Sequence, residues 1–361
     1  MEVNNCPAKL SGCSSPTAAQ RIDRRLPAAG RFVPPRSVRA SFPQAFPDTL
    51  IHRPLSDNLF HSGMTATPTI ASRINRRFAA LREAGEMGIV AYVTAGDPSL
   101  GATLQFVQAL AEAGADVIEL GVPFSDPVAD GPTIQRASER ALKSGATLHG
   151  VLELVRQIRN SKGAAAEVPL VLFSYYNPVF QMGLEKFAAN TSSTGADGVL
   201  ITDLTPEESS DYRRILSAHH LDTIFLAAPT SDDNRLQKIS EVSSGFLYLI
   251  SRTGVTGAKD ALPDDLPALL RRTRQFTNLP VAVGFGISLP GHVSVLGGLA
   301  DAAVVGSALV SEIEKATAQD SSPRAIENAA AALSAKIRSL KEAARAGLSR
   351  LSTSPRHEVA P

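Results

Sequence analysis

Cysteine is nearly absent from this sequence. The 361 residues contain only Cys6 and Cys13, and both lie close to the N-terminus. The body of the chain therefore has no cysteine for a disulfide, a thiolate nucleophile or a metal site, and we expect a reducing compartment. Histidines are few and scattered, and the adjacent pair His219 and His220 lacks the spacing and the nearby carboxylate of a metal site. We expect no bound metal.

The sequence also lacks a charge excess and a long apolar run. The formal net charge is +1, which provides no basic surface for nucleic acid or for an anionic membrane. Hydrophobic residues make up 43% of the chain, but no uncharged run is long enough to span a bilayer. A nucleotide P-loop is missing as well. We expect a globular protein that acts on a small, uncharged or anionic molecule.

Residues 1–63 differ in composition from the rest of the chain. They are rich in Pro, Ser, Ala and Arg, carry 8 basic and 4 acidic residues, and show no helical or strand periodicity. We predict a disordered extension. Three interpretations remain open: an organelle leader, an inert extension, or a start site assigned too early, with Met64 as the true start. Cytoplasmic localisation is expected, and a plastid stroma is the alternative if 1–63 is a transit peptide.

From Gly88 onward, short β-branched or apolar runs alternate with polar turns and amphipathic helical patterns, which is typical of a parallel sheet covered by helices. Eight such β/α units close into a (β/α)8 TIM barrel. An open doubly wound sheet would need a glycine-rich dinucleotide turn after its first strand, and Gly96-Asp97-Pro98 is not one. The expected strands are 89–94, 117–120, 169–174, 198–202, 223–227, 246–250, 281–284 and 302–305.

Additional helices are expected at both ends of this α/β barrel. A helical run at 70–84 precedes the first strand, and an amphipathic helix that includes Ile326, Leu333 and Leu340 follows the last. The interval between the second and third strands is long enough for two helices, at 133–143 and 148–159, and for a functional loop. We predict a catalytic domain at 64–348 and a flexible tail at 349–361.

Two carboxylates are the best candidates for chemistry. Glu119 lies within an apolar strand, where side-chain alternation points it into the barrel mouth, and burial there would raise its pKa toward that of a proton-transfer group. A buried Glu paired with a basic residue is the alternative. Asp126 and Asp130 lie in the turn-rich loop that follows this strand, and either could instead be a turn or cap residue. We expect Asp130 to be in a wetter loop and to stay ionised.

Glycines follow the last three strands. Gly257, Gly286 and Gly306 let backbone N–H groups approach an anion, and a helix that starts at Ser307 adds partial positive charge. The pattern predicts a phosphate site, which commonly follows strands seven and eight of such barrels. Phe124, Tyr175 and Tyr248 gather near the mouth, which fits either an aromatic substrate or simple packing.

Four motifs then resemble the tryptophan synthase α subunit family. They are YVTAGDP at 92–98, ELGVPFSDPVADGP at 119–132, SRTGVTG at 251–257 and GFGI at 284–287, in family order and spacing. The resemblance extends from about Ile70 to about Lys315. It implies a TIM barrel that cleaves indole-3-glycerol phosphate to indole and glyceraldehyde 3-phosphate in tryptophan biosynthesis, without a cofactor in this chain.

The resemblance also implies residue roles. Glu119 would transfer protons, and Asp130 would accept a hydrogen bond from the indole N–H. The implied substrate-binding residues are Tyr92, Phe246, Tyr248 and Thr256, with Thr256 also bonded to Asp130, and the implied phosphate-binding residues are Gly257, Gly286, Gly306 and Ser307. Tyr92 departs from the apolar aromatic residue that is also common in the family, which could alter contacts to indole.

A partner is implied as well: a β subunit that carries pyridoxal phosphate (PLP), in an αββα heterotetramer. The contact would involve Pro123, Asp126, Asn177, Pro178 and Phe180. This chain has no lysine in a setting suited to PLP. Three alternatives remain: a lyase that works without a β subunit, a non-catalytic homologue, and another phosphate-binding barrel such as a sugar-phosphate isomerase.

Overall fold

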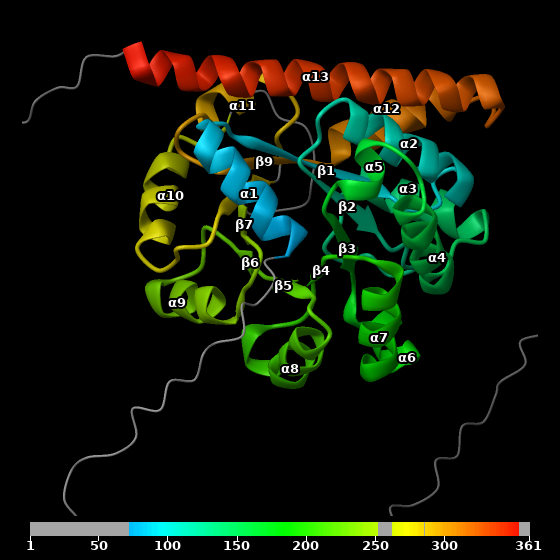
Figure 1. Ribbon diagram of the computed structural model, residues 1–361, viewed down its shortest axis with the longest axis horizontal. Helices are drawn as coiled ribbons and strands as arrows, with labels where there is room; N and C mark the ends of the chain where they lie inside the picture. Colours follow the sequence, from blue (N-terminus) through cyan, green and yellow to red (C-terminus); the bar gives the residue numbers. More distant parts are fainter. Residues whose placement is uncertain (1–71, 252–261, 285, 354–361) are drawn as a thin grey trace, which may run out of the picture. The chain divides into compact units, whose positions relative to one another are not determined.

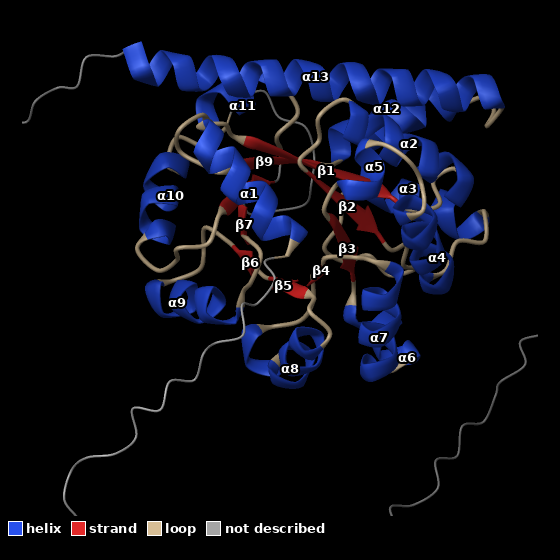
Figure 2. Ribbon diagram, in the orientation of Figure 1, coloured by secondary structure: helices blue, strands red, loops and turns tan. Residues whose placement is uncertain are grey.

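A parallel β-barrel forms the centre of the described part of the chain (Figure 1, Figure 2). The computed structural model describes residues 72–251, 262–284 and 286–353. Within these residues the strand pairs are parallel, and neighbours follow the order β5-β4-β3-β2-β1-β9-β8-β7-β6. The strands are β1 (Gly88–Thr94), β2 (Val117–Gly121), β3 (Leu170–Ser174), β4 (Gly198–Ile201), β5 (Asp222–Ile224), β6 (Leu226–Ala227), β7 (Leu247–Ile250), β8 (Val281–Gly284) and β9 (Ala302–Val305).

The barrel closes at Phe225. β5 pairs with β4, β6 pairs with β7, and the backbone carbonyl of Phe225 already accepts a hydrogen bond from the Tyr248 N–H of β7 at 3.2 Å. The ends of the strand order are thus adjacent in sequence, and the TIM-barrel prediction is confirmed. One correction applies: the strand expected at 223–227 is divided, because the chain changes its pairing partner at Phe225.

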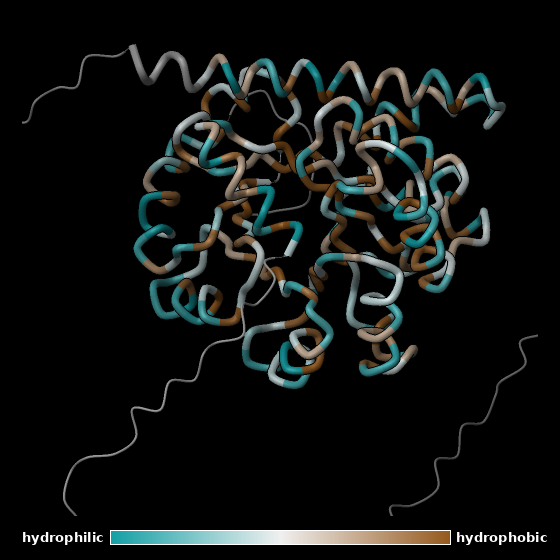
Figure 3. Tube along the Cα trace, viewed as in Figure 1, coloured by the Kyte–Doolittle hydropathy of each residue, from teal (hydrophilic) through white to brown (hydrophobic). Residues whose placement is uncertain are grey.

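Helices surround the barrel and bury their apolar faces against the outer side of the strands. These faces and the outward-pointing strand residues form one buried cluster, and Figure 3 shows hydrophobic residues concentrated in the central strands. None of the described helices is long and apolar enough to span a membrane. The helices between strands are α2 (Leu100–Glu112), α3 (Pro132–Lys143), α4 (Leu148–Arg159), α5 (Ala164–Glu167), α6 (Tyr176–Met182), α7 (Leu184–Thr194), the 3₁₀ turn η1 (Pro206–Glu208), α8 (Ser210–Ala218), α9 (Asp233–Val242), α10 (Leu266–Arg274), α11 (Pro290–Leu296) and α12 (Ser307–Thr317).

Helix α1 (Arg73–Ala84) closes the amino-terminal end of the barrel. Its apolar side chains Ile74, Phe78 and Leu81 are buried in the cluster that fills the barrel interior. Ser72 caps this helix by accepting a hydrogen bond from the Asn75 N–H at 3.2 Å. Among the described residues, this end of the barrel is filled, and the cavity inside the ring of strands lies at their carboxyl ends.

Helix α13 (Pro323–Thr353) is the expected last helix and packs against α2, α11 and α12. The buried Lys341 ties it to the barrel through an ion pair of 2.8 Å between its Nζ and Oδ2 of Asp116. The helix continues to Thr353, past the predicted start of the tail at 349. Residues 1–63 and 354–361 lie outside the described residues, so the domain division remains a prediction.

Candidate active site

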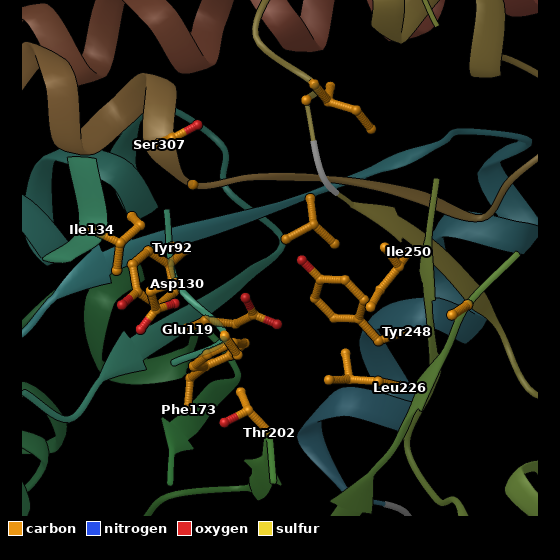
Figure 4. A pocket seen from close by; sticks show the side chains of 16 residues that line it. Tyr92, Glu119, Asp130, Ile134, Phe173, Thr202, Leu226, Tyr248, Ile250 and Ser307 are labelled. Atoms are coloured by element: carbon orange, nitrogen blue, oxygen red, sulfur yellow. The ribbon is translucent and has the colours of Figure 1, made fainter. Parts of the chain in front are cut away.

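A cavity of about 350 Å³ opens at the carboxyl ends of the strands (Figure 4). Its wall combines aromatic and aliphatic side chains with two carboxyl groups and a glycine-rich rim. Below we call it the barrel cavity. It is lined by Tyr92, Glu119, Ala129, Asp130, Ile134, Phe173, Thr202, Leu226, Ala228, Tyr248, Ile250, Gly286, Ile287, Val304, Gly306 and Ser307.

Glu119 lies on the floor of the barrel cavity. In β2 it pairs in register with Tyr92 of β1 and Val171 of β3, and its side chain points inward as the alternation predicted. It is fully buried, and among the described residues neither carboxyl oxygen has a hydrogen-bond partner. Burial raises the pKa of Glu119 to about 8, so the group is mostly protonated at neutral pH. The structure therefore does not show the alternative, in which Glu119 is paired with a basic residue.

Asp130 lies beside Glu119, at the end of the loop that leads into α3. Gly131 caps this helix in an extended conformation and Pro132 occupies its first turn, so the loop ends sharply at the barrel cavity. The sequence predicted a wetter position, but Asp130 is only 9% exposed, because its side chain lies in the wall of the barrel cavity against Tyr175. Burial raises its pKa to about 6, and a hydrogen bond from Tyr175 opposes the shift. Asp130 is thus mostly ionised at neutral pH.

Tyr175 holds Asp130 in place. Its hydroxyl donates to Oδ2 of Asp130 at 3.1 Å and accepts from the Ala129 N–H at 3.0 Å. Its ring packs on Phe124 with 5.2 Å between centroids. The sequence placed Tyr175 near the mouth but gave it no role. The sequence signal for a role in the site was its position directly after β3, the strand that pairs with the Glu119 strand.

Aromatic rings form two walls of the barrel cavity. In Figure 4 the side chains of Glu119 and Tyr248 point toward each other, with Tyr92 on the Glu119 side. The ring of Tyr92 meets that of Phe173 edge-on, with 5.3 Å between centroids. Two glycines make room for the tyrosines. A Cβ on Gly121 would lie 2.1 Å from the Tyr92 hydroxyl oxygen, and one on Gly284 would lie 2.2 Å from that of Tyr248.

Phe246 does not line the barrel cavity. It is fully buried one layer below, where its ring packs on Phe78 of α1 with 5.7 Å between centroids. The physical reason is its register: Phe246 faces inward like Tyr248 but precedes it by two residues, or about 6.6 Å along a strand. It supports the floor of the site from below, and its role in substrate binding stays a prediction.

Gly286, Gly306 and Ser307 form the glycine-rich rim of the barrel cavity, where the sequence predicts an anion site. Gly286 has a φ of +85°, a conformation that L side chains rarely adopt, and it lines the barrel cavity with Gly306 and Ser307. Helix α12 begins at Ser307, and no described side chain caps its first turn. The free amide groups and the helix dipole there favour an anion. Thr256 and Gly257 lie outside the described residues.

The predicted partner-contact residues lie beside the barrel mouth. Asp126 and Asn177 are exposed, Pro178 is half-buried and Phe180 is 64% exposed, which is unusual for a phenylalanine. Pro123 is buried at the start of its loop. The structure thus brings four of these five residues to the surface.

The barrel cavity can therefore bind an apolar ring and an anion at once. A neutral acid and an ionised carboxylate both line the cavity, and glycines and a helix start without a side-chain cap form its rim. Such a pair, with pKa values separated by its surroundings, is suited to general acid–base catalysis.

Comparison with known proteins gives a consistent result. Residues 78–345 match the family model described as tryptophan synthase alpha chain. The tryptophan synthase alpha chain of Solibacter usitatus is 50% identical over 244 residues, covering 68% of this chain and 90% of the relative. That of Geobacter sulfurreducens is 47% identical over 249 residues, covering 69% and 93%.

Solved structures agree. The chain resembles tryptophan synthase of Mycobacterium tuberculosis with a TM-score of 0.67 at 34% identity, covering 76% of this chain and 99% of that one. The α subunit from Legionella pneumophila gives a TM-score of 0.68 at 35% identity, with the same coverage. The chain belongs to the tryptophan synthase alpha chain family.

Proposed function

We propose that Glu119 and Asp130 carry out the reaction of this family, the cleavage of indole-3-glycerol phosphate into indole and glyceraldehyde 3-phosphate. The observation that carries this proposal is the Glu119 carboxyl: fully buried, without a hydrogen-bond partner among the described residues, and open to the same cavity as Asp130 and the glycine rim. A buried polar group without a partner is costly, so its retention indicates that a bound molecule uses it.

Glu119 acts first as an acid. With a pKa of about 8 it carries a proton at neutral pH and donates it to C3 of the indole ring, which becomes an indoleninium cation. The resulting carboxylate takes the proton from the adjacent glycerol hydroxyl. An oxygen electron pair forms the aldehyde C=O, the bond between C3 and the side chain breaks, and its electron pair restores the aromatic ring. Glu119 ends the cycle protonated.

Asp130 stabilises the charge that develops on the ring. As a carboxylate it accepts a hydrogen bond from the indole N–H, and this bond strengthens when the ring becomes cationic. Tyr175 supports the role because its hydroxyl fixes one carboxylate oxygen and lowers the pKa of Asp130. Tyr92 and Tyr248 border the slot for the flat ring, and Phe246 supports it from below.

The phosphate group binds at the glycine-rich rim. Gly286, Gly306 and the amide groups at Ser307 supply donors and partial positive charge. Thr256 and Gly257, which lie outside the described residues, complete the site by family analogy: Gly257 at the phosphate and Thr256 at Asp130. Binding both ends of one molecule places its reacting carbon beside Glu119.

We further propose that a β subunit is the partner, in an αββα assembly in the cytoplasm. The β subunit would receive indole directly. The exposed ring of Phe180 beside Asn177, and the exposed Asp126, support a contact with the partner. PLP would be held by the β subunit. The described lining of the barrel cavity contains no lysine, and the buried Lys341 is paired with Asp116.

Steady-state assays test the proposal. The protein should form indole from indole-3-glycerol phosphate, and indole-propanol phosphate should compete with the substrate. Glu119→Gln should abolish turnover but should still bind indole-propanol phosphate. Indole formation at the wild-type rate by Glu119→Gln would disprove the proposed chemistry. A sugar-phosphate isomerase would not bind the competitor.

A further assay compares turnover with and without β subunit. A rate that is high alone and unchanged by β would contradict the assembly and favour an independent lyase.

A further inference from the structure

Helices α3 and α12 both begin at the barrel cavity. α3 directly follows Asp130 and Gly131, and α12 starts at Ser307. Near the cavity Ile134 of α3 and Val310 of α12 belong to the same buried cluster, and Figure 4 places Ser307, Ile134 and Asp130 on the same side of the site. Each helix thus carries one end of the proposed substrate site.

An ionic cluster joins the two helices farther from the cavity. Glu314 of α12 accepts hydrogen bonds from Arg136 of α3, Nε to Oε1 at 2.7 Å and Nη2 to Oε2 at 2.8 Å. Its Oε1 also accepts from Nη1 of Arg140 at 2.8 Å. Glu314 lies about 10 Å along the helix from Ser307, given a rise of 1.5 Å per residue. Hydrogen bonds from Arg136, with the attraction of Arg140, hold the pKa of Glu314 at about 2, so the cluster stays charged at neutral pH.

The same cluster is anchored to the barrel. Arg140 binds the buried Asp97, in the loop after β1, through two parallel hydrogen bonds: Nε to Oδ1 at 2.8 Å and Nη2 to Oδ2 at 2.8 Å. Ser144, at the end of α3, donates to the Gly96 carbonyl at 2.9 Å. Two-point contacts of a planar guanidinium fix orientation as well as distance. α3 is therefore held both by α12 and by the first β/α loop.

We propose that Glu314, Arg136 and Arg140 are positioning residues that hold Asp130 and the start of α12 at the separation of one substrate molecule. This inference rests on the proposed function, in which these two sites bind opposite ends of that molecule. None of the three residues lines the barrel cavity. If the helices shift apart, each end site can still bind its own half of the substrate. The intact substrate, in which the two halves are covalently linked, can then reach both sites only in a strained conformation.

Competition assays with indole, glycerol 3-phosphate and indole-propanol phosphate test the inference. Glu314→Ala removes the ionic contact between the helices while leaving the apolar packing of Ile134 and Val310 and the Arg140–Asp97 pair in place. It should raise the inhibition constant of indole-propanol phosphate about tenfold and that of each separate half less than about twofold. Glu314→Gln keeps hydrogen-bond acceptance without the charge and should fall between wild type and Glu314→Ala.

Arg235→Gln is the matched control, because it breaks a comparable ion pair on α9, with Glu207 at 2.6 Å, and should change none of the three constants. Equal weakening of all three ligands by Glu314→Ala, or no weakening, would overturn the inference. If Glu314→Ala does not give a cooperative thermal transition, Glu314→Gln decides by the same criterion. A wild-type protein that binds indole-propanol phosphate no more tightly than its halves would instead refute the proposed function.

Discussion

Replacing Glu119 with Gln should inactivate the protein and also remove a loss of stability that wild type suffers as pH rises. Burial raises the pKa of Glu119 from 4.5 to about 8, so between these pH values the folded state binds a proton that the unfolded state has lost. Folding stability therefore falls as pH rises through this window. Gln cannot ionise and escapes this loss. At 1.36 kcal/mol per pKa unit, the free energy of unfolding of the variant should gain about 4 kcal/mol on wild type between pH 5 and pH 9.

Urea unfolding of wild type and Glu119→Gln at pH 5, 6, 7, 8 and 9 measures this difference. Any constant cost of burying the amide cancels, because only the change with pH is compared. Most of the gain should be complete by pH 8, where the folded-state carboxyl begins to ionise. Glu83→Gln, on the exposed side of α1, is the control and should follow wild type within about 0.5 kcal/mol. If the curves of wild type and Glu119→Gln run parallel, the Glu119 carboxyl does not have the raised pKa on which the mechanism depends.

Three further predictions concern activity. Because Asp130 must be ionised and Glu119 protonated, kcat/KM should be bell-shaped with limbs near pH 6 and pH 8 and about tenfold lower at pH 5 and pH 9, and a flat profile would contradict these assignments. Tyr175→Phe removes the hydroxyl that lowers the pKa of Asp130, so the acidic limb should move to higher pH, and an unmoved limb would show that this hydrogen bond does not control Asp130. Gly121→Ala pushes Tyr92 out of its place and should weaken inhibition by indole-propanol phosphate about tenfold, whereas unchanged inhibition would mean that the ring position of Tyr92 is unimportant for binding.

Local sequence patterns were enough to predict the barrel and part of the site. A strand alternates its side chains strictly, so an acidic residue at the inward position of an apolar strand had to face the interior, as Glu119 does. Glycines after the last strands and a helix start at Ser307 indicated the anion rim for similarly local reasons.

Tertiary contacts decided the rest. Nothing in residues 123–132 indicates that Asp130 is buried, because the turn formers of this loop suit an exposed position equally well. The contact between Arg140 and Glu314 joins residues 174 positions apart. In the sequence, each is indistinguishable from an ordinary charged residue on a helix surface. The division of the expected strand 223–227 follows from closing the ring, which no single segment encodes.

The closure point at Phe225 divides the residues of the candidate active site between two lengths of chain. Glu119, Asp130 and Tyr175 precede it, whereas Tyr248 and Ser307 follow it. Neither length contains both the carboxyl groups proposed to transfer protons and the rim proposed to bind phosphate. Two fragments produced by cutting the chain in the turn before β5 should consequently be inert apart and regain turnover only when they reassociate into a complete ring.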